Sequence, residues 1–74
     1  MYDTKIMKGK DFIGRARQYA RTRGLEFAHD TRQGKGSHTM IRVGQFRTVV
    51  KNGEIGKSLF KRMLKQLRID KEDF

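Results

Sequence analysis

The stretch that decides the fold of this chain is residues 38–50, HTMIRVGQFRTVV. Its first half alternates two sets of side chains, with Thr39, Ile41 and Val43 on one side and His38, Met40 and Arg42 on the other. A period of two is typical of a β-strand, because successive side chains point to opposite faces of a sheet. A second apolar run begins two residues later. The stretch therefore predicts a hairpin of two strands, residues 38–43 and 46–50, joined by a tight turn at Gly44 and Gln45.

Helices are expected on both sides of this hairpin. Apolar side chains recur at three- and four-residue spacing over residues 10–23, and Gly24 then supplies the glycine with which many helices end. The same spacing recurs from residue 57 to about residue 67. Between the first helix and the hairpin, residues 25–29 alternate as a short strand does, and residues 30–36 form a polar connection.

The segments outside these elements are short and polar. We expect residues 1–8 to be a polar lead and residues 51–56 to be a loop. Asp70 is predicted to cap a last helical turn, with Asp73 three residues further on.

The order helix, strand, strand, strand, helix indicates an α+β fold that forms a single domain over residues 1–74. A three-stranded antiparallel sheet must have one face covered, and two amphipathic helices on that face would cover it. Ile41 and Val43 would then point toward the helices. His38 and Arg42 would be left on the open face of the sheet, as the alternation along the strand requires.

Charge indicates the kind of partner. The 74 residues carry 18 lysines and arginines against eight acidic residues, for a net charge of +10. Such an excess favours a polyanion, either a nucleic acid or an acidic protein. The chain has no cysteine and therefore no disulfide or cysteine-based metal site. It also lacks an apolar run of membrane-spanning length and a signal-peptide pattern, so we expect a cytoplasmic protein without membrane association.

The candidate site is the stretch QGKGSHT, residues 33–39, at the start of a predicted strand. Backbone amides of Gly36 and Ser37 could turn toward a phosphate, with Lys35 and Arg42 adding positive charge. Histidine exchanges protons near neutral pH, so His38 could deprotonate a ribose 2′-hydroxyl beside a bound RNA backbone. The product would carry a 2′,3′-cyclic phosphate, and this chemistry would need no metal or cofactor.

Simpler interpretations of the same residues stay open. Glycine and lysine are common in ordinary turns, and GKGS lacks the phosphate-binding pattern of nucleotide hydrolases. A histidine at a strand start is often only an exposed polar residue. His29 could carry a second proton, but Leu25 and Phe27 share its parity and favour a structural role at the edge of the core. Two histidines without matching carboxylates or cysteines make a poor metal site, so none is predicted.

The motifs taken together resemble those of HicA toxins, the small mRNA interferases of HicA/HicB toxin–antitoxin modules. The resemblance rests on GKGSH at residues 34–38, a glycine-containing turn, a Thr-Val strand end, and GKSLFKRMLKQL at residues 56–67. It implies a fold like that of double-stranded-RNA-binding domains, with His38 catalytic, and neutralisation by a HicB-like antitoxin that is commonly acidic. Many relatives have a Val-Pro pair at the end of the third strand, where this chain has Val49, Val50 and Lys51.

The leading hypothesis is therefore the toxin of a type II toxin–antitoxin system. It would be a metal-independent endoribonuclease that cleaves mRNA, monomeric when free. One alternative is a non-catalytic module that binds double-stranded RNA. A third is a basic protein whose main ligand is an acidic protein. The residues do not assign the acid that protonates the leaving group.

Overall fold

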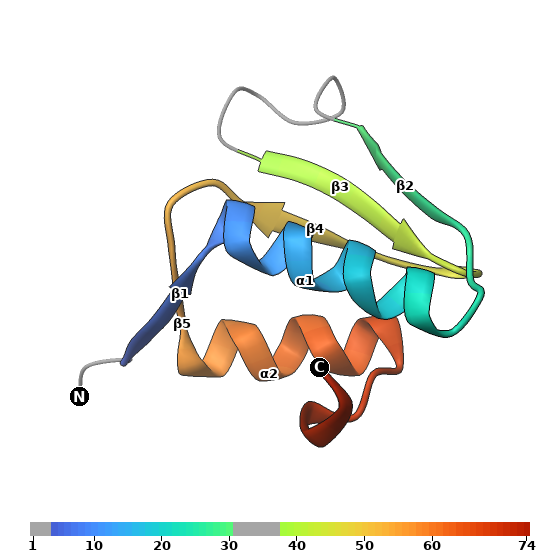
Figure 1. Ribbon diagram of the computed structural model, residues 1–74. Helices are drawn as coiled ribbons and strands as arrows, with labels where there is room; N and C mark the ends of the chain where they lie inside the picture. Colours follow the sequence, from blue (N-terminus) through green and yellow to red (C-terminus); the bar gives the residue numbers. More distant parts are fainter. Residues whose placement is uncertain (1–3, 31–37) are drawn as a thin grey trace.

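The computed structural model describes residues 4–30 and 38–74, in which two helices and a three-stranded sheet share one core (Figure 1). A second, two-stranded sheet lies beside the start of the first helix. In chain order the elements are β1 (Lys5–Lys8), α1 (Gly9–Thr22), β2 (Phe27–Asp30), β3 (His38–Val43), β4 (Phe46–Lys51), β5 (Glu54–Gly56), α2 (Lys57–Leu67) and a 3₁₀ turn, η1 (Lys71–Asp73).

The predicted hairpin is confirmed and forms the centre of the sheet. β3 pairs antiparallel with β4, from Val43 opposite Phe46 to His38 opposite Lys51, and β2 pairs with the other side of β3. Gly44 has a φ of 63°, as the first residue of a two-residue hairpin turn requires. The order of strands across the sheet is therefore β2-β3-β4.

The predicted parity of β3 is also confirmed. Thr39, Ile41 and Val43 are at most 2% exposed, whereas His38 and Arg42 are exposed. The buried set faces the two helices, which cover one side of the sheet and leave the other side open.

Small and aromatic side chains hold α1 against this core. Ala16 and Ala20 are fully buried, and their small size lets the helix backbone approach the sheet. Phe12 is also fully buried and meets Phe60 of α2 edge to face, with ring centroids 5.9 Å apart. Burying a side chain of this size contributes about 1.5–3 kcal/mol, so Phe12 is one of the main links between the two helices.

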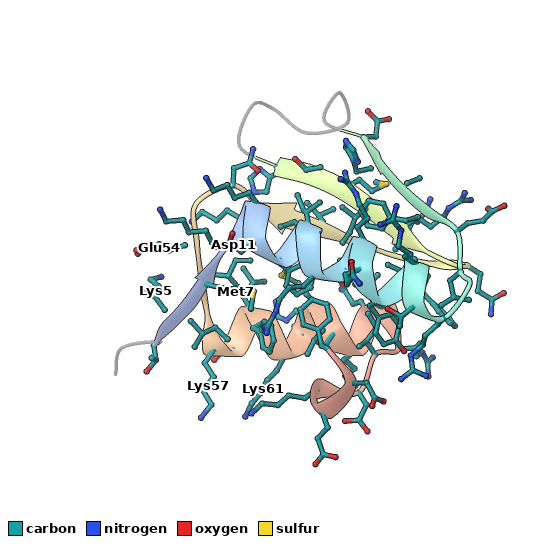
Figure 2. All side chains as sticks on the ribbon, in the orientation of Figure 1. Lys5, Met7, Asp11, Glu54, Lys57 and Lys61 are labelled. Carbon is teal, nitrogen blue, oxygen red and sulfur yellow. The ribbon has the colours of Figure 1, made fainter. Side chains whose placement is uncertain are left out.

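The prediction that residues 1–8 and 51–56 lack regular structure is wrong for the part described. Lys5–Lys8 and Glu54–Gly56 form the antiparallel pair β1-β5, in which Met7 lies opposite Ile55. Ile55 is fully buried, and Met7 packs against the core (Figure 2). The sequence does not predict this pair, because both strands are short and contain charged residues. They gain their stability from contacts with the rest of the fold.

The junction of the two sheets is tightly packed at Gly9, the first residue of α1. The Gly9 N–H donates to the Gly53 carbonyl at 2.7 Å. A β-carbon on Gly9 would overlap the Lys51 carbonyl oxygen and lie 3.1 Å from its carbon. Backbone meets backbone here without an intervening side chain, and only glycine leaves the necessary room.

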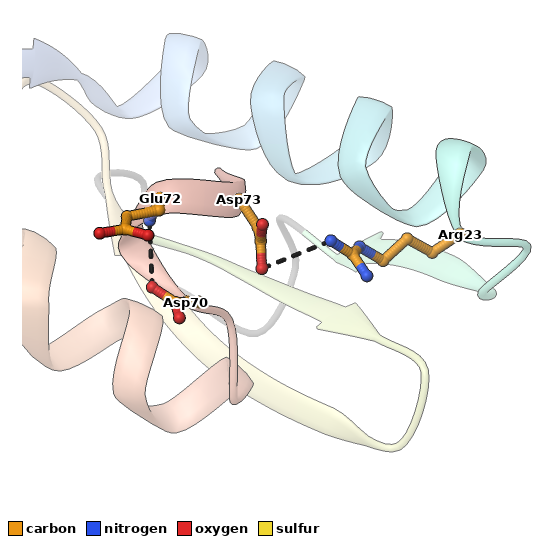
Figure 3. Close-up of polar contacts among 4 residues, drawn as sticks. All are labelled: Arg23, Asp70, Glu72 and Asp73. Carbon is orange, nitrogen blue, oxygen red and sulfur yellow. Dashed lines mark hydrogen bonds and ion pairs between the residues drawn. The ribbon is translucent and has the colours of Figure 1, made fainter.

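Two smaller predictions are corrected at the ends of the helices. β2 begins at Phe27 and not at Leu25, because the Leu25 N–H donates to the Ala20 carbonyl and completes the end of α1. Asp70 does act as an N-cap, accepting a hydrogen bond from the Glu72 N–H at 3.1 Å (Figure 3). The turn it caps is 3₁₀, and Asp73 instead forms an ion pair with Arg23 at 3.4 Å.

Candidate nucleic-acid interface

The open face of the sheet carries three pairs of side chains that lie directly opposite one another on β3 and β4. From the start of β3 to the turn, these pairs are His38 with Lys51, Met40 with Val49, and Arg42 with Arg47. The open face thus has an apolar pair between two basic pairs. Counting from the turn, all three are pairs whose backbones do not bond to each other, the type in which side chains come closest.

The arginine pair has no stabilising role that the fold explains. Like charges directly opposite each other on a sheet are destabilising. Arg42 is relieved in part by Glu26 at 3.4 Å, but both side chains are at least half exposed, so this ion pair contributes little. A polyanion lying across the face would neutralise Arg42 and Arg47 together.

His38 lies at the first position of β3 and is exposed, as its predicted place on the open face requires. Its nearest basic neighbour across the strands is Lys51, the last residue of β4. Arg42 lies four residues along β3, a separation of about 13 Å for an extended strand. Of the predicted phosphate-binding residues, Lys35, Gly36 and Ser37 fall outside the described residues, so the structure places only Arg42 on the face with His38.

His29 does not share that face. It lies opposite Ile41, so its side chain is on the helix-covered side of the sheet, although it is exposed at the edge. Its ring centroid is 6.0 Å from that of Phe27. The two histidines therefore lie on opposite faces, an arrangement that does not favour His29 as a proton carrier for chemistry at His38.

The open face is shallow. A depression of about 510 Å³ is lined by residues of all three strands, among them Asp30, Met40, Arg42 and Arg47. His29 and Ile41 also border it, although the register points their side chains to the helix-covered side. A surface of this kind suits an extended polymer better than an enclosed small molecule. In residues 4–30 and 38–74, no three histidine, aspartate or glutamate side chains come together as metal ligands would. No helix in those ranges has the length and apolar character to cross a membrane.

Two arginines, one in α1 and one at its C-cap, serve packing as well as charge. Arg17 lies over the ring of Phe27 at 5.5 Å, and Arg23 lies over Tyr19 at 4.7 Å. In these contacts the guanidinium group lies against the aromatic ring, so each arginine covers part of an aromatic side chain. The charges of Arg17 and Arg23 are therefore not by themselves evidence of a binding surface. Among the described residues, neither Arg42 nor Arg47 of the open face lies over an aromatic ring.

Comparison of the chain with protein-family models, with curated proteins and with solved structures gives no match in any of the three.

Arg47 and Lys51 were missed as site residues from the sequence. The signal was nonetheless present, because a two-residue turn at residues 44–45 fixes every pair across the hairpin. Counting outward from that turn places Arg47 opposite Arg42 and Lys51 opposite His38.

Proposed function

We propose that this protein is a metal-independent endoribonuclease of the HicA toxin type that binds mRNA across its open sheet face and cleaves it with His38. The observation that carries the proposal is the pairing of His38 with Lys51 on an exposed face that also holds Arg42 and Arg47. A residue that can accept a proton and a residue that carries positive charge are thus direct cross-strand neighbours on the face proposed to hold phosphates. The resemblance of GKGSH and of α2 to HicA motifs supports the same proposal, as does an α+β fold compatible with the architecture of double-stranded-RNA-binding domains.

In the proposed reaction, the His38 imidazole removes the proton of a ribose 2′-hydroxyl. The 2′-oxygen forms a bond to the adjacent phosphorus, and the bond from phosphorus to the 5′-oxygen breaks. The Lys51 ammonium stabilises negative charge that develops on the non-bridging phosphate oxygens. Protonation of the departing 5′-oxygen leaves a 2′,3′-cyclic phosphate and a 5′-hydroxyl end. The ribose supplies the nucleophile, and His38 and Lys51 supply the base and the positive charge. The proton for the 5′-oxygen comes from solvent or from an acid that the residues do not assign.

The regulatory part of the proposal concerns an acidic partner. A charge of +10 on 74 residues suits neutralisation by an acidic HicB-like antitoxin, with the free protein monomeric in the cytoplasm. Mutual repulsion between two such basic chains opposes self-association.

The test is induced expression of the wild-type chain beside His38→Ala and His29→Ala. We expect growth arrest and RNA with cyclic-phosphate ends from the wild type and from His29→Ala, and neither from His38→Ala. The histidine on the opposite face serves as the matched control. A folded His38→Ala protein that still arrests growth and cleaves RNA would show that the catalytic assignment is wrong.

The second candidate is a non-catalytic module that binds double-stranded RNA, which the arginine pair on the open face would also suit. This alternative predicts salt-dependent binding to RNA duplexes and intact RNA after long incubation with the purified protein. Cleavage that depends on His38 separates the two candidates.

A further inference from the structure

The outer edge of β4 is a second candidate surface, separate from the catalytic pair. In the part of the chain that the structure describes, β4 pairs with β3 on one side and with no strand on the other. The hairpin register makes Phe46, Thr48 and Val50 bond inward to β3. The backbone N–H and C=O groups of Arg47 and Val49 therefore point outward along the edge. An edge of this kind is the template to which another extended chain can add.

A groove of about 890 Å³ runs beside this edge, between β4 and α2. Its apolar lining consists of Met40, Phe46, Val49, Leu59 and Met63, and its basic lining consists of Arg47, Arg62, Lys65 and Arg68. No acidic side chain lines the groove among the described residues. Val49 is 47% exposed, the largest exposed fraction of the large apolar side chains described. A hydrogen bond from Thr48 to Gln66 ties the strand to the helix along the groove.

Arg68 gives independent support for a role of this groove. It has a φ of 59°, which makes it the one non-glycine residue with a positive φ in the described ranges. Glycine is the usual residue at this position after a helix, because a side chain is strained there. Arg68 lies over the ring of Phe46 at 5.6 Å, which places its guanidinium in the lining of the groove. A positive charge that is held in a groove by a strained residue favours a binding role for that groove.

We propose that this groove binds an extended acidic segment of a partner protein, which adds to β4 as a fourth strand. Backbone groups of the segment would bond to Arg47 and Val49, apolar side chains would cover Val49 and Leu59, and carboxylates would meet the arginines and lysine of α2. This inference rests on the proposed function, because the proposed function supplies the acidic partner. The chemistry of the groove does not involve His38.

The groove fits a polypeptide better than its two competitors. An RNA backbone would suit the cations, but it has no alternating N–H and C=O groups to pair with a strand edge, nor apolar side chains for Val49 and Leu59. A second copy of this chain would bring the same four cations against their counterparts. Like charges placed together across an interface oppose association, so an acidic strand is the occupant that matches both the edge and the charge.

The experiment uses a synthetic peptide of alternating valine and glutamate, as long as β4, and follows binding by NMR and calorimetry. A second peptide of the same sequence carries N-methyl groups on alternate amides, which removes its ability to pair along an edge. We expect the first peptide to shift the Arg47 and Val49 amides and to slow their hydrogen exchange. The methylated peptide should bind at least about tenfold more weakly, because it loses several hydrogen bonds at once.

Charge-reversal variants locate the site on the helix. Arg62→Glu with Lys65→Glu alters the groove, whereas Lys57→Glu with Lys61→Glu makes the same change of charge on α2 outside it. Figure 2 shows Lys57 and Lys61 pointing away from the sheet. We expect the first variant to weaken peptide binding at least about tenfold and the second to change it less than about threefold. Circular dichroism checks that both variants are folded.

Three results would overturn the inference. The first is equal binding of the methylated peptide or an equal effect of the two variants. The second is a non-cleavable 2′-O-methyl RNA that shifts the groove residues while the peptide does not. The third is a protein dimer whose interface contains Val49 in the absence of peptide. RNA cleavage by the wild-type protein is measured in parallel, so failure of the groove proposal and failure of the His38 proposal remain distinguishable.

Discussion

The contact between Gly9 and the Lys51 carbonyl gives the sharpest prediction about stability, in the substitution Gly9→Ala. The added β-carbon would overlap a backbone oxygen, so α1 must move away from the junction of β4 and β5. Forcing one extra carbon into a well-packed site costs about 1–3 kcal/mol, and any gain in helix propensity offsets less than about 1 kcal/mol. For a domain of this size, each kcal/mol corresponds to about 4–8 °C in Tm.

Gly14→Ala is the matched control on the same helix. Gly14 is exposed, and a β-carbon there would have no neighbour within 4 Å. Replacing a glycine in a helix interior by alanine stabilises by about 0.5–1 kcal/mol. We therefore expect opposite signs for one identical chemical change: Tm should fall for Gly9→Ala and rise for Gly14→Ala.

Urea unfolding followed by circular dichroism measures both changes, with thermal melts as a second readout. A Gly9→Ala protein that is as stable as the wild type would refute the reasoning. It would mean that α1 does not press against the connection between β4 and β5, and that the end of β4 carrying Lys51 is positioned in some other way.

Two further substitutions test the open face. Lys51→Met should reduce RNA cleavage at least about tenfold in single-turnover assays, while RNA binding falls much less. The reason is that the ammonium acts mainly on charge that develops during the reaction. Equal losses in binding and cleavage would contradict this role. Arg47→Gln should leave the protein at least as stable as the wild type, since it removes a like-charge pair, and should lower the slope of log affinity against log salt by about 0.7–0.9. An unchanged slope in filter-binding measurements would exclude Arg47 from the RNA contact.

The part of the fold that could be predicted is the part that the chain encodes locally. The turn at residues 44–45 fixes the register of the hairpin, and the alternation along β3 then decides that Ile41 is buried and His38 exposed. The pattern of apolar residues in α2 is equally local, and the structure confirms its bounds at Lys57 and Leu67.

The parts of the fold that could not be predicted from the sequence depend on contacts between distant segments. β1 has no strand-like alternation of its own and becomes a strand only because β5 lies beside it. Leu25 alternates with its neighbours as a strand residue would, but its backbone is already used to end α1. The groove beside β4 could not be anticipated either, because it requires the position of α2 relative to the strand edge. The position of Lys51 could have been predicted, since the hairpin register alone places it opposite His38.

The pairing of β1 with β5 has a consequence for the order in which the protein folds and opens. Lys5 lies opposite Gly56, so their pairing closes a loop that contains α1 and all three strands of the larger sheet. The entropy of closing such a long loop delays their pairing, whereas α1, α2 and the hairpin depend on nearby residues. We expect the amides of β1 and β5 to exchange hydrogen by local opening well before those of β3. Because Gly9 and Lys51 meet at the same junction, each such opening would also loosen the end of β4 opposite His38.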